Sequence, residues 1–229
     1  ILASGPSVAM YDISKLKNCC TMSFNRSYIA FNDWKFTPTY FVGLDSVVNY
    51  DNRKQYKKLI KSSNISRFFF SRDSRYESYL KAKNVDLVDI NDMPSDPTID
   101  FNRTLNVGNS GLFGLQIAIG ILGFREIYLL GCEANYEEVV PGVTIQNGLY
   151  VSNSNTDINH FRPDYYGVGT TYNKPGSQKW HYNAWLSFYN KYFKNKLLNV
   201  KIFNLSPISK LTFFKRARFN IVTKNITSL

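Results

Sequence analysis

Short apolar segments alternate with amphipathic segments along most of the chain. The apolar segments are rich in β-branched and aromatic residues, and they predict strands over Ile1–Ala3, Cys20–Phe24, Tyr40–Gly43, Arg67–Phe70, Val85–Val88, Glu126–Leu130 and Val200–Leu205. Periodic patterns between several of them predict helices over Asp51–Ser62, Ser74–Lys83, Gly111–Leu122 and Lys179–Leu197. Strands that alternate with helices are typical of βαβ units, so the pattern predicts an α/β fold with a mostly parallel sheet flanked by helices.

Residues 134–176 break this rhythm. They are rich in Asn, Gly, Pro and Tyr and show little periodicity. A stretch of this length without clear elements is usually a functional lid or a disordered insert. We expect a lid insertion over the carboxyl edge of the sheet, because open α/β sheets bind ligands at that edge. The whole chain, 1–229, is predicted to be a single domain that carries this insertion.

Charge is distributed unevenly along the 229 residues. The chain carries 28 Lys and Arg against 17 Asp and Glu, and the last acidic residue is Asp164. Residues 165–229 contain 11 basic residues and none that is acidic, so all of the net charge of +11 comes from this part. Such a block suggests attraction to an anionic surface, and a solvated basic face is the alternative.

Two polar turns are candidates for a nucleotide site. Ser4, Gly5, Pro6 and Ser7 follow the first predicted strand, where glycine allows a close backbone approach and Ser7 offers a hydroxyl group to a phosphate or ribose. An ordinary turn would explain this segment as well. The turn is neither a dinucleotide fingerprint nor a Walker loop.

The second turn, Asn106 to Gly111, leads directly into a predicted buried helix. Asn109 or Ser110 is placed to cap that helix, and a glycine-rich turn at a helix N-terminus presents free amides to an anion. A simple cap explains Ser110 but not the surrounding glycines and asparagines. We expect the two turns to meet at one edge of the parallel sheet and to bind a nucleotide together.

Several segments resemble bacterial sialyltransferases of glycosyltransferase family 42. Gly5-Pro6-Ser7, Asp12 to Leu16 and Phe24 to Tyr28 resemble the opening of that family. Asn109 to Ala118 with Gly123 to Gly131 resembles its central helix and following strand, and Asn204 to Pro207 resembles its last core turn. The related pterin-pyrophosphokinase-like proteins share the Gly-Pro-Ser opening.

The resemblance implies a GT-A-like, Rossmann-type domain that transfers sialic acid or a related nonulosonic acid from a CMP-sugar to a glycan or glycolipid, with inversion and without a metal or other cofactor. It implies that Ser4, Gly5, Pro6 and Ser7 flank the nucleotide and that Asn25 contacts the donor. It also places Asn109, Ser110 and Gly111 at the phosphate, sugar carboxylate or cytidine, and Gly131 with Glu133 at the nucleotide. Glu133 stands where the family has aspartate, Val107 where it has arginine, and Asp45 where it has an asparagine that belongs to the donor site.

The residues themselves agree with a metal-free site. None of the twelve aspartates forms an Asp-x-Asp motif, the usual clamp for the metal of a nucleotide diphosphate. The single bridging phosphate of a CMP-sugar can leave with help from hydroxyl groups and helix-end amides. Tyrosines of the lid are candidates for this role, and we expect one or two of these five to act: Tyr136, Tyr150, Tyr165, Tyr166 and Tyr172.

Activation of an acceptor hydroxyl requires a general base, and histidine is the usual choice. The chain has two histidines. His160 lies in a polar and aromatic cluster within the lid, and His181 opens the helix after it, 26 positions before Pro207. Either is a candidate base, with a slight preference for His160, and a structural hydrogen-bonded histidine is the alternative for both.

Residues Leu211 to Val222 interleave aromatic rings with cations. Such a segment can insert its rings among lipid headgroups while its cations meet lipid phosphates. We therefore expect peripheral binding to the inner membrane of a bacterial cell from the cytoplasmic side, where lipid-linked glycan acceptors reside. No nucleic-acid-binding motif accompanies the segment, so nucleic acid is not an expected partner, and a homo-oligomer remains open.

Two further functions remain possible on the sequence. A pterin pyrophosphokinase-like enzyme would need ATP, Mg²⁺ and metal-binding carboxylates near Asp45, Asp89, Asp92 or Glu133. A non-enzymatic, membrane-associated nucleotide-binding protein would have a disordered lid and would not need either histidine.

Overall fold

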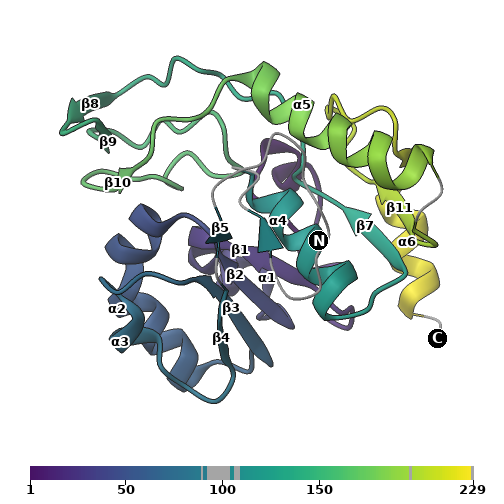
Figure 1. The fold of residues 1–229 in the computed structure, drawn as a ribbon, viewed down its shortest axis with the longest axis horizontal. Helices are drawn as coiled ribbons and strands as arrows, with labels where there is room; N and C mark the ends of the chain where they lie inside the picture. Colours follow the sequence, from purple (N-terminus) through teal and green to yellow (C-terminus); the bar gives the residue numbers. More distant parts are fainter. Residues whose placement is uncertain (89, 92–103, 106–108, 196–197, 228–229) are drawn as a thin grey trace.

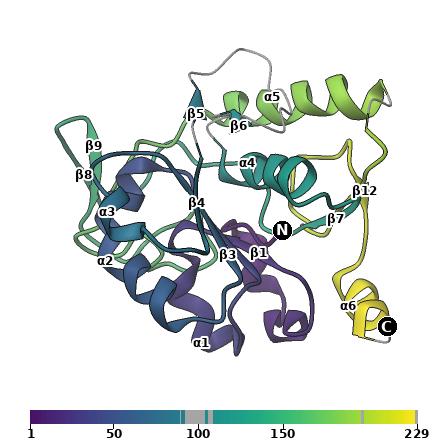
Figure 2. The same ribbon diagram turned by 60° about the horizontal axis from the view of Figure 1, so that its bottom comes forward.

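Parallel strands form the centre of the molecule, and helices lie on both sides of them (Figures 1 and 2). The computed structural model describes all residues except 89, 92–103, 106–108, 196–197 and 228–229. One parallel sheet has the order β1-β2-β3-β4, with strands Met22–Phe24 (β1), Tyr40–Gly43 (β2), Arg67–Ser71 (β3) and Val85–Val88 (β4). A second has the order β12-β11-β7, also parallel, with strands Glu126–Leu129 (β7), Lys201–Asn204 (β11) and Lys215–Arg216 (β12).

The first residues of the chain join these two sheets. Leu2 forms parallel bridges to Ser23 on one side and to Leu130 on the other. Its N–H donates to the carbonyl of Met22 at 2.8 Å, and the N–H of Ala3 donates to Leu130 at 2.8 Å. The chain therefore starts in the middle, proceeds outward through β1 to β4, and returns to the other side with β7, as in a Rossmann-like arrangement. This order places the carboxyl ends of the first segment and of β7 next to each other.

Helices follow the strands as the pattern predicts. The α-helices are Phe31–Trp34 (α1), Ser46–Ser62 (α2), Glu77–Leu80 (α3), Ser110–Gln116 (α4), Gln178–Tyr189 (α5) and Phe219–Thr227 (α6). The 3₁₀ segments are Pro6–Met10 (η1), Ile13–Leu16 (η2) and Asn25–Ala30 (η3), and π-helical turns extend α4 as Ile117–Ile121 (η4) and α5 as Asn190–Lys194 (η5). A short parallel pair, Ile90–Asn91 (β5) and Thr104–Leu105 (β6), lies beside α4. None of the helices that the structure describes has both the length and the apolar character needed to cross a membrane.

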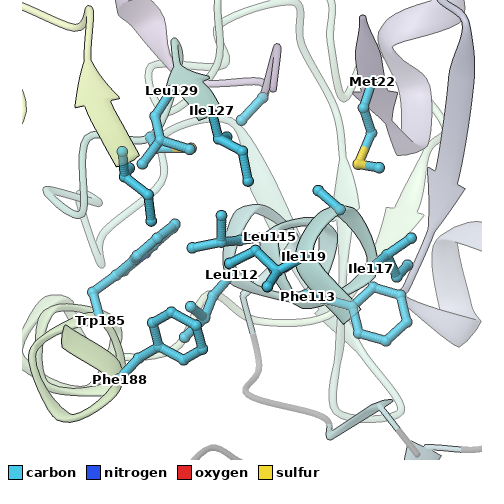
Figure 3. Close-up of a cluster of buried hydrophobic side chains, with 14 of the residues drawn as sticks. Met22, Leu112, Phe113, Leu115, Ile117, Ile119, Ile127, Leu129, Trp185 and Phe188 are labelled. Atoms are coloured by element: carbon cyan, nitrogen blue, oxygen red, sulfur yellow. The ribbon is translucent and has the colours of Figure 1, made fainter. Parts of the chain in front are cut away.

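The pleat of β2 and β3 divides the core into two layers. Phe41, Phe68 and Phe70 point to the side covered by α1 and α2, whereas Val42 and Phe69 belong to the layer of α4 and α5. Alternating side chains on opposite faces are what a strand dictates, and both faces are buried because helices cover both. Figure 3 shows the second layer, in which Leu112, Leu115 and other apolar residues of α4 pack against β7 and α5.

Most predicted elements are confirmed, and the differences have local causes. β2 and β4 have the predicted bounds, and of the strand expected at Ile1–Ala3 only the bridges of Leu2 are formed. α2 starts five residues before the prediction because the Asp45 side chain caps it, accepting from the N–H groups of Val47 and Val48. The helix predicted at Ser74–Lys83 is reduced to the single turn of α3.

The expectation that 134–176 lacks regular elements is wrong. Val143–Gln146 (β8), Leu149–Ser152 (β9) and Thr171–Tyr172 (β10) form an antiparallel sheet in the order β10-β9-β8. Asn147 and Gly148 connect β8 to β9 with positive φ angles of 51° and 78°, the turn chemistry of a tight hairpin. In Figure 1 this sheet lies beyond the N-terminal end of α2, away from β7 and β11.

The aromatic side chains of the basic C-terminal segment are largely inside the protein, which corrects the expectation that they insert into a membrane. Phe214 and Phe219 are 4% and 2% exposed, and Phe219 stacks on Tyr11 with ring centroids 4.5 Å apart. Phe213 packs on Tyr189 of α5 at 4.9 Å. The rings complete the core, and the cations Lys215 and Arg218 remain exposed.

Candidate functional site

A cleft of about 710 Å³ opens at the carboxyl ends of the parallel strands. Residues from the turn after Leu2, from the loops after β1, β2, β3 and β7, from the start of α4 and from segment 134–176 line it. Most of the site residues predicted from the sequence are among them: Ser4, Gly5, Pro6, Asn25, Asp45, Asn109, Ser110, Gly111, Gly131, Glu133, Tyr136, His160, Tyr166 and His181. Of the other predicted residues, Tyr172 also lines the cleft, Ser7 and Tyr165 lie directly behind the lining, and Tyr150 is not part of it.

Ser7 and Glu133 form the buried base of the cleft. The Ser7 hydroxyl donates to Oε1 of Glu133, and the Ser7 N–H donates to the same oxygen at 3.3 Å. Oγ of Ser206 lies 2.9 Å from Ser7 Oγ and accepts the N–H of Gly131 at 2.8 Å. Burial raises the pKa of Glu133, and the hydrogen bonds from Ser7 oppose that shift. The first turn is thus fixed to the loop after β7 by side-chain hydrogen bonds.

Gly5 is required by this packing. A Cβ atom at position 5 would lie 1.5 Å from Oε2 of Glu133 and 2.6 Å from the carbonyl oxygen of Gly131. The sequence suggested that this glycine lets a ligand approach the backbone. In the structure, the space that a side chain would need is filled by Glu133, so the glycine allows the two loops to touch.

The second turn lies on the other side of the same cleft. Asn109 caps α4 by accepting the Leu112 N–H at 3.2 Å, as the sequence predicts. A Cβ atom at Gly111 would lie 2.9 Å from Cys132 Sγ and 3.2 Å from the Trp185 ring, so this glycine lets α4 approach β7 and α5. Residues 106–108 of the predicted turn lie outside the described residues.

Asn25 connects the loop after β1 to this turn. Its backbone has φ of 49°, in the left-handed region that asparagine tolerates better than most residues. Its Nδ2 donates to Ser110 Oγ at 3.1 Å, while Oδ1 is buried without a partner among the described residues. An acceptor in this state can receive a hydrogen bond from a ligand in the cleft.

His160 is held by a carboxylate. Its Nδ1 lies 2.9 Å from both oxygens of Asp157, and both side chains are nearly buried. An N–H at Nδ1 that donates to the carboxylate leaves Nε2 as the unprotonated, basic nitrogen. Among the described residues, Nε2 has no hydrogen-bond partner. The tautomer that a general base needs is therefore the one that Asp157 favours.

Hydrogen bonds and stacking anchor His160 above the first turn. The N–H of Phe161 donates to the carbonyl of Ser4 at 2.9 Å. The ring of His160 stacks on Tyr165 with centroids 4.1 Å apart and planes 5° apart. The hydroxyl of Tyr165 lies 2.9 Å from Ser4 Oγ and accepts the N–H of Arg26 at 3.1 Å. This part of segment 134–176 is packed on the body, and Phe161 and Tyr165 belong to a core cluster.

His181 has a different environment. It lies in the first turn of α5, is 6% exposed, and stacks on Tyr136 with ring centroids 5.0 Å apart. Its Nδ1 is buried without a partner among the described residues. Burial lowers the pKa of His181 to about 4, and the carboxylate of Glu138 opposes this only weakly. His181 is therefore neutral at pH 7 and is a weak base.

The tyrosines of the segment are held as neutral hydroxyl groups. Burial raises the pKa of Tyr136 and of Tyr165 far above the ordinary value for a phenol. Tyr166 stacks on Tyr172 with centroids 3.9 Å apart, and burial raises its pKa too. The phenols can donate hydrogen bonds to an anion, but they do not supply a base at neutral pH.

Carboxyl groups outnumber cations in the lining, and most have internal partners. Asp45 caps α2 and accepts Asn173 Nδ2 at 2.9 Å and 3.0 Å, Asp73 pairs with Arg75 at 2.6 Å, and Asp157 holds His160. Glu133 is hydrogen-bonded to Ser7, and Glu137 is the fifth carboxyl group of the lining. The cations in the lining are Arg72 and Lys174. In the part of the chain that the structure describes, no three His, Cys, Asp or Glu side chains form a group that could hold a metal ion.

Sequence reasoning missed two residues of the site. Asp157 lies three positions before His160, a spacing that would have suggested the pair. Ser206 follows β11 and reaches the base of the cleft only because β11 lies beside β7, a pairing between residues about 75 positions apart. A local pattern cannot show such a contact.

Comparisons of the chain with protein-family models, with curated proteins and with solved structures found no match. The function of the site is therefore inferred from its own residues and their geometry.

Proposed function

We propose that this protein is an inverting glycosyltransferase of GT-A-like fold that transfers sialic acid or a related nonulosonic acid from a CMP-sugar to a hydroxyl group of a glycan. One observation carries the proposal. The turn Ser4–Ser7 and the turn at Asn109–Gly111, about 100 residues apart, line the same cleft, and His160 with its Asp157 partner is anchored above the first of them. The motif resemblance to family 42 glycosyltransferases supports the same reaction.

The transfer needs one base and stabilisation of one leaving group. The acceptor hydroxyl attacks the anomeric carbon of the donor sugar, a new carbon–oxygen bond forms, and the bond from that carbon to the phosphate oxygen breaks. The proton of the hydroxyl goes to Nε2 of His160, and Asp157 stabilises the imidazolium that results. CMP leaves with the electron pair of the broken bond.

Neutral donors are available for the departing phosphate. The Tyr136 phenol lies beside both histidines, with ring centroids 6.0 Å from His160 and 5.0 Å from His181. Ser110 and Gly111, at the start of α4, line the same cleft, and their hydroxyl and amide groups are further candidate donors. Pre-oriented donors of this kind stabilise a developing anion strongly where water is excluded.

The charges of the lining are compatible with an anionic donor. Asp45, Asp73 and Asp157 are each engaged by a helix end, a cation or a histidine, and burial shifts Glu133 toward its neutral form. Two cations, Arg72 and Lys174, also line the cleft and can attract the phosphate and the sugar carboxylate.

A ligand panel tests the proposal. Thermal unfolding should be measured with CMP, CDP, UDP, ATP and CMP-sialic acid, each with EDTA and with Mg²⁺. We expect CMP and CMP-sialic acid to raise the unfolding temperature equally in both conditions, because a ligand that binds only the native state stabilises it. Stabilisation by ATP alone, and only with Mg²⁺, would contradict the proposal.

The surplus of carboxyl groups favours one second candidate, the Mg²⁺-dependent pterin pyrophosphokinase-like enzyme. Asp45 and Glu133, two of the carboxylates that such an enzyme would use, line the cleft. Asp89 and Asp92 lie outside the described residues. The ATP and Mg²⁺ arm of the panel decides between the two functions.

The proposal includes peripheral binding to the cytoplasmic face of a bacterial inner membrane. Since the aromatic rings near the C-terminus are mostly buried, the attraction would come from exposed cations such as Lys215 and Arg218. Binding to vesicles should then fall steeply with added salt, and salt-independent binding would contradict this part.

A further inference from the structure

A second basic region lies on α2 and on the loop between β3 and α3, far in sequence from the basic C-terminal residues. Tyr50, Arg53, Lys57 and Lys61 follow the spacing of one helix face, and Lys54 and Lys58 lie next to them. The buried residues of α2 are Val48, Asn49, Asn52 and Tyr56, on the opposite side. The basic side of α2 therefore faces away from the core.

Aromatic rings are interleaved with these cations. The guanidinium of Arg53 lies 4.0 Å from the ring centroid of Tyr50 and 5.3 Å from that of Tyr79 on α3. Nζ of Lys57 lies 5.6 Å from the Tyr79 ring, and the guanidinium of Arg75 lies 6.0 Å from the Tyr50 ring. We call these five residues, Tyr50, Arg53, Lys57, Arg75 and Tyr79, the α2–α3 patch.

The α2–α3 patch is continuous with the mouth of the cleft. Arg72 and Asp73, which follow β3, line the cleft, and Asp73 pairs with Arg75 of the patch at 2.6 Å. From Arg75 the patch continues along α2 to Lys57, and Lys61 follows it on the same helix face, about 16 Å beyond Tyr50 at the rise of a helix. A chain-like ligand with one end in the cleft would lie over it.

The charge of this surface indicates that the ligand is negatively charged. Within the described segments α2, the loop after β3 and α3, the acidic residues are Asp51, Asp73 and Glu77; Asp73 pairs with Arg75, and Asp51 lies 3.9 Å from Arg26. Against these stand seven Lys and Arg residues of α2 and of the loop after β3: Arg53, Lys54, Lys57, Lys58, Lys61, Arg72 and Arg75.

We infer that the α2–α3 patch binds the acceptor, and that the acceptor is an anionic oligosaccharide. Cations at this spacing fit carboxylate or phosphate groups on successive sugars, and tyrosine rings give sugar rings an apolar face to pack on. This inference rests on the proposed function, because it assumes that the terminal sugar of the bound oligosaccharide carries the hydroxyl group that reacts in the cleft. A single-stranded nucleic acid also combines anions with stacking groups, and the test separates it from a glycan.

The test measures binding of labelled oligomers to the full chain by fluorescence anisotropy, without any donor. The probes are hexagalacturonate, which carries carboxylates, the neutral maltohexaose, and hexathymidylate. We expect hexagalacturonate to bind more tightly than either of the others. The variant Arg53→Glu/Lys57→Glu should weaken that binding about tenfold or more, as expected for the loss of two partly exposed ion contacts.

A charge-matched control excludes a general effect of net charge. Lys17→Glu/Lys194→Glu changes the net charge by the same amount at exposed positions outside the patch, and it should bind hexagalacturonate like the wild type. If the first variant unfolds, Arg53→Gln/Lys57→Gln replaces it, with an expected loss in the same direction. An equal loss in the control, tighter binding of hexathymidylate, or equal binding of maltohexaose would each overturn the inference.

The inference and the proposed function fail separately. Stabilisation by CMP reports on the cleft and should be unchanged in Arg53→Glu/Lys57→Glu. If CMP stabilises the protein but hexagalacturonate does not bind at the patch, the proposed acceptor site is wrong and the proposed donor site is still supported. If hexagalacturonate binds at the patch but neither CMP nor CMP-sialic acid stabilises the protein, the binding surface is supported and the proposed transferase activity is contradicted.

Discussion

The floor and the roof of the cleft are built in different ways. The floor consists of Ser4–Ser7, Asn109–Gly111 and Gly131–Glu133, which end the central strands or begin α4, and its glycines and serines are occupied in holding loops together. The roof, residues 134–176, carries the His160–Asp157 pair and the neutral tyrosines. The comparison shows that the small-residue turns supply a rigid base, whereas the groups that can move a proton come from the segment above.

The largest expected effect is on turnover, and it concerns the roof. Asp157→Ala removes the carboxylate that orients His160 and should lower the rate of sugar transfer about 10²- to 10⁴-fold, the range for loss of general-base catalysis. Asp157→Asn keeps the shape, but its amide can hold His160 in the wrong tautomer, so a similar loss is expected. The assay is release of CMP from CMP-sialic acid in the presence of an acceptor.

Asp157 is a positioning residue, so a purely structural role must be excluded. The affinity for CMP should stay unchanged in both variants, and kcat should fall without a matching rise in KM for the donor. Wild-type turnover in Asp157→Ala would show that His160 does not need this partner.

The next effect concerns the floor. Gly5→Ala brings a methyl group to 1.5 Å from Glu133 Oε2, so the loops must separate and the free energy of unfolding should fall by about 3 kcal/mol or more. In a Glu133→Ala background the same substitution should cost clearly less, because part of the clash is gone. Denaturant unfolding of the four proteins of this double-mutant cycle measures the coupling.

Gly148→Ala is the matched control for the glycine. It has positive φ and no atom within 4 Å of the added Cβ, so backbone strain alone should cost about 1 kcal/mol. Equal losses at positions 5 and 148, or no coupling between positions 5 and 133, would show that the floor is looser than the structure implies.

A smaller effect comes from His181 of α5, whose ring stacks on Tyr136 of the roof, and it depends on pH. Its pKa in the folded state is about 4, below the unfolded value near 6.5. The unfolded chain therefore binds more protons in this interval, and stability should be complete above about pH 6.5 and fall as the pH drops toward 4. The loss is at most about 3 kcal/mol.

His181→Phe keeps a ring against Tyr136 but cannot take a proton. Urea unfolding from pH 7.5 to pH 4.5 should show a smaller fall in stability for this variant than for the wild type. The same slope in both proteins would mean that His181 is not the group that resists protonation.

The smallest effect tests the link between roof and floor. Tyr165→Phe removes the hydroxyl that contacts Ser4 and the N–H of Arg26, and it should lower stability by about 1–2 kcal/mol. The ring stack on His160 is preserved, so any change in turnover should be much smaller than in Asp157→Ala. A loss above about 4 kcal/mol in thermal unfolding would mean that the roof is held mainly at this one point.

The sequence predicts the floor better than the roof because local rules govern the floor. The β-branched and aromatic runs predict β2 and β4, and an asparagine before an apolar helix predicts the cap at Asn109. The function of Gly5 was misread, because the carboxylate that requires it is about 130 residues away. In the roof, Asn147-Gly148 is the turn signal of the β8–β9 hairpin, but the many other turn residues of 134–176 make it hard to distinguish.

The His160 environment could not be predicted because burial and stacking depend on the whole fold. The sequence left the choice between His160 and His181 nearly even. What separates them is Asp157 beside one ring and the buried, unpartnered Nδ1 of the other. The spacing of three residues is compatible with the first feature, but only the fold shows that both side chains are buried and that Nδ1 of His181 has no partner among the described residues.

The most direct test of the account is the turnover of CMP-sialic acid by the full chain in EDTA, for the wild type, His160→Ala and His181→Ala. The account predicts steady release of CMP with an acceptor present, loss of that release in His160→Ala while CMP still stabilises the variant against heat, and substantial release in His181→Ala. Unchanged release in His160→Ala, or release by the wild type that requires Mg²⁺, would contradict it.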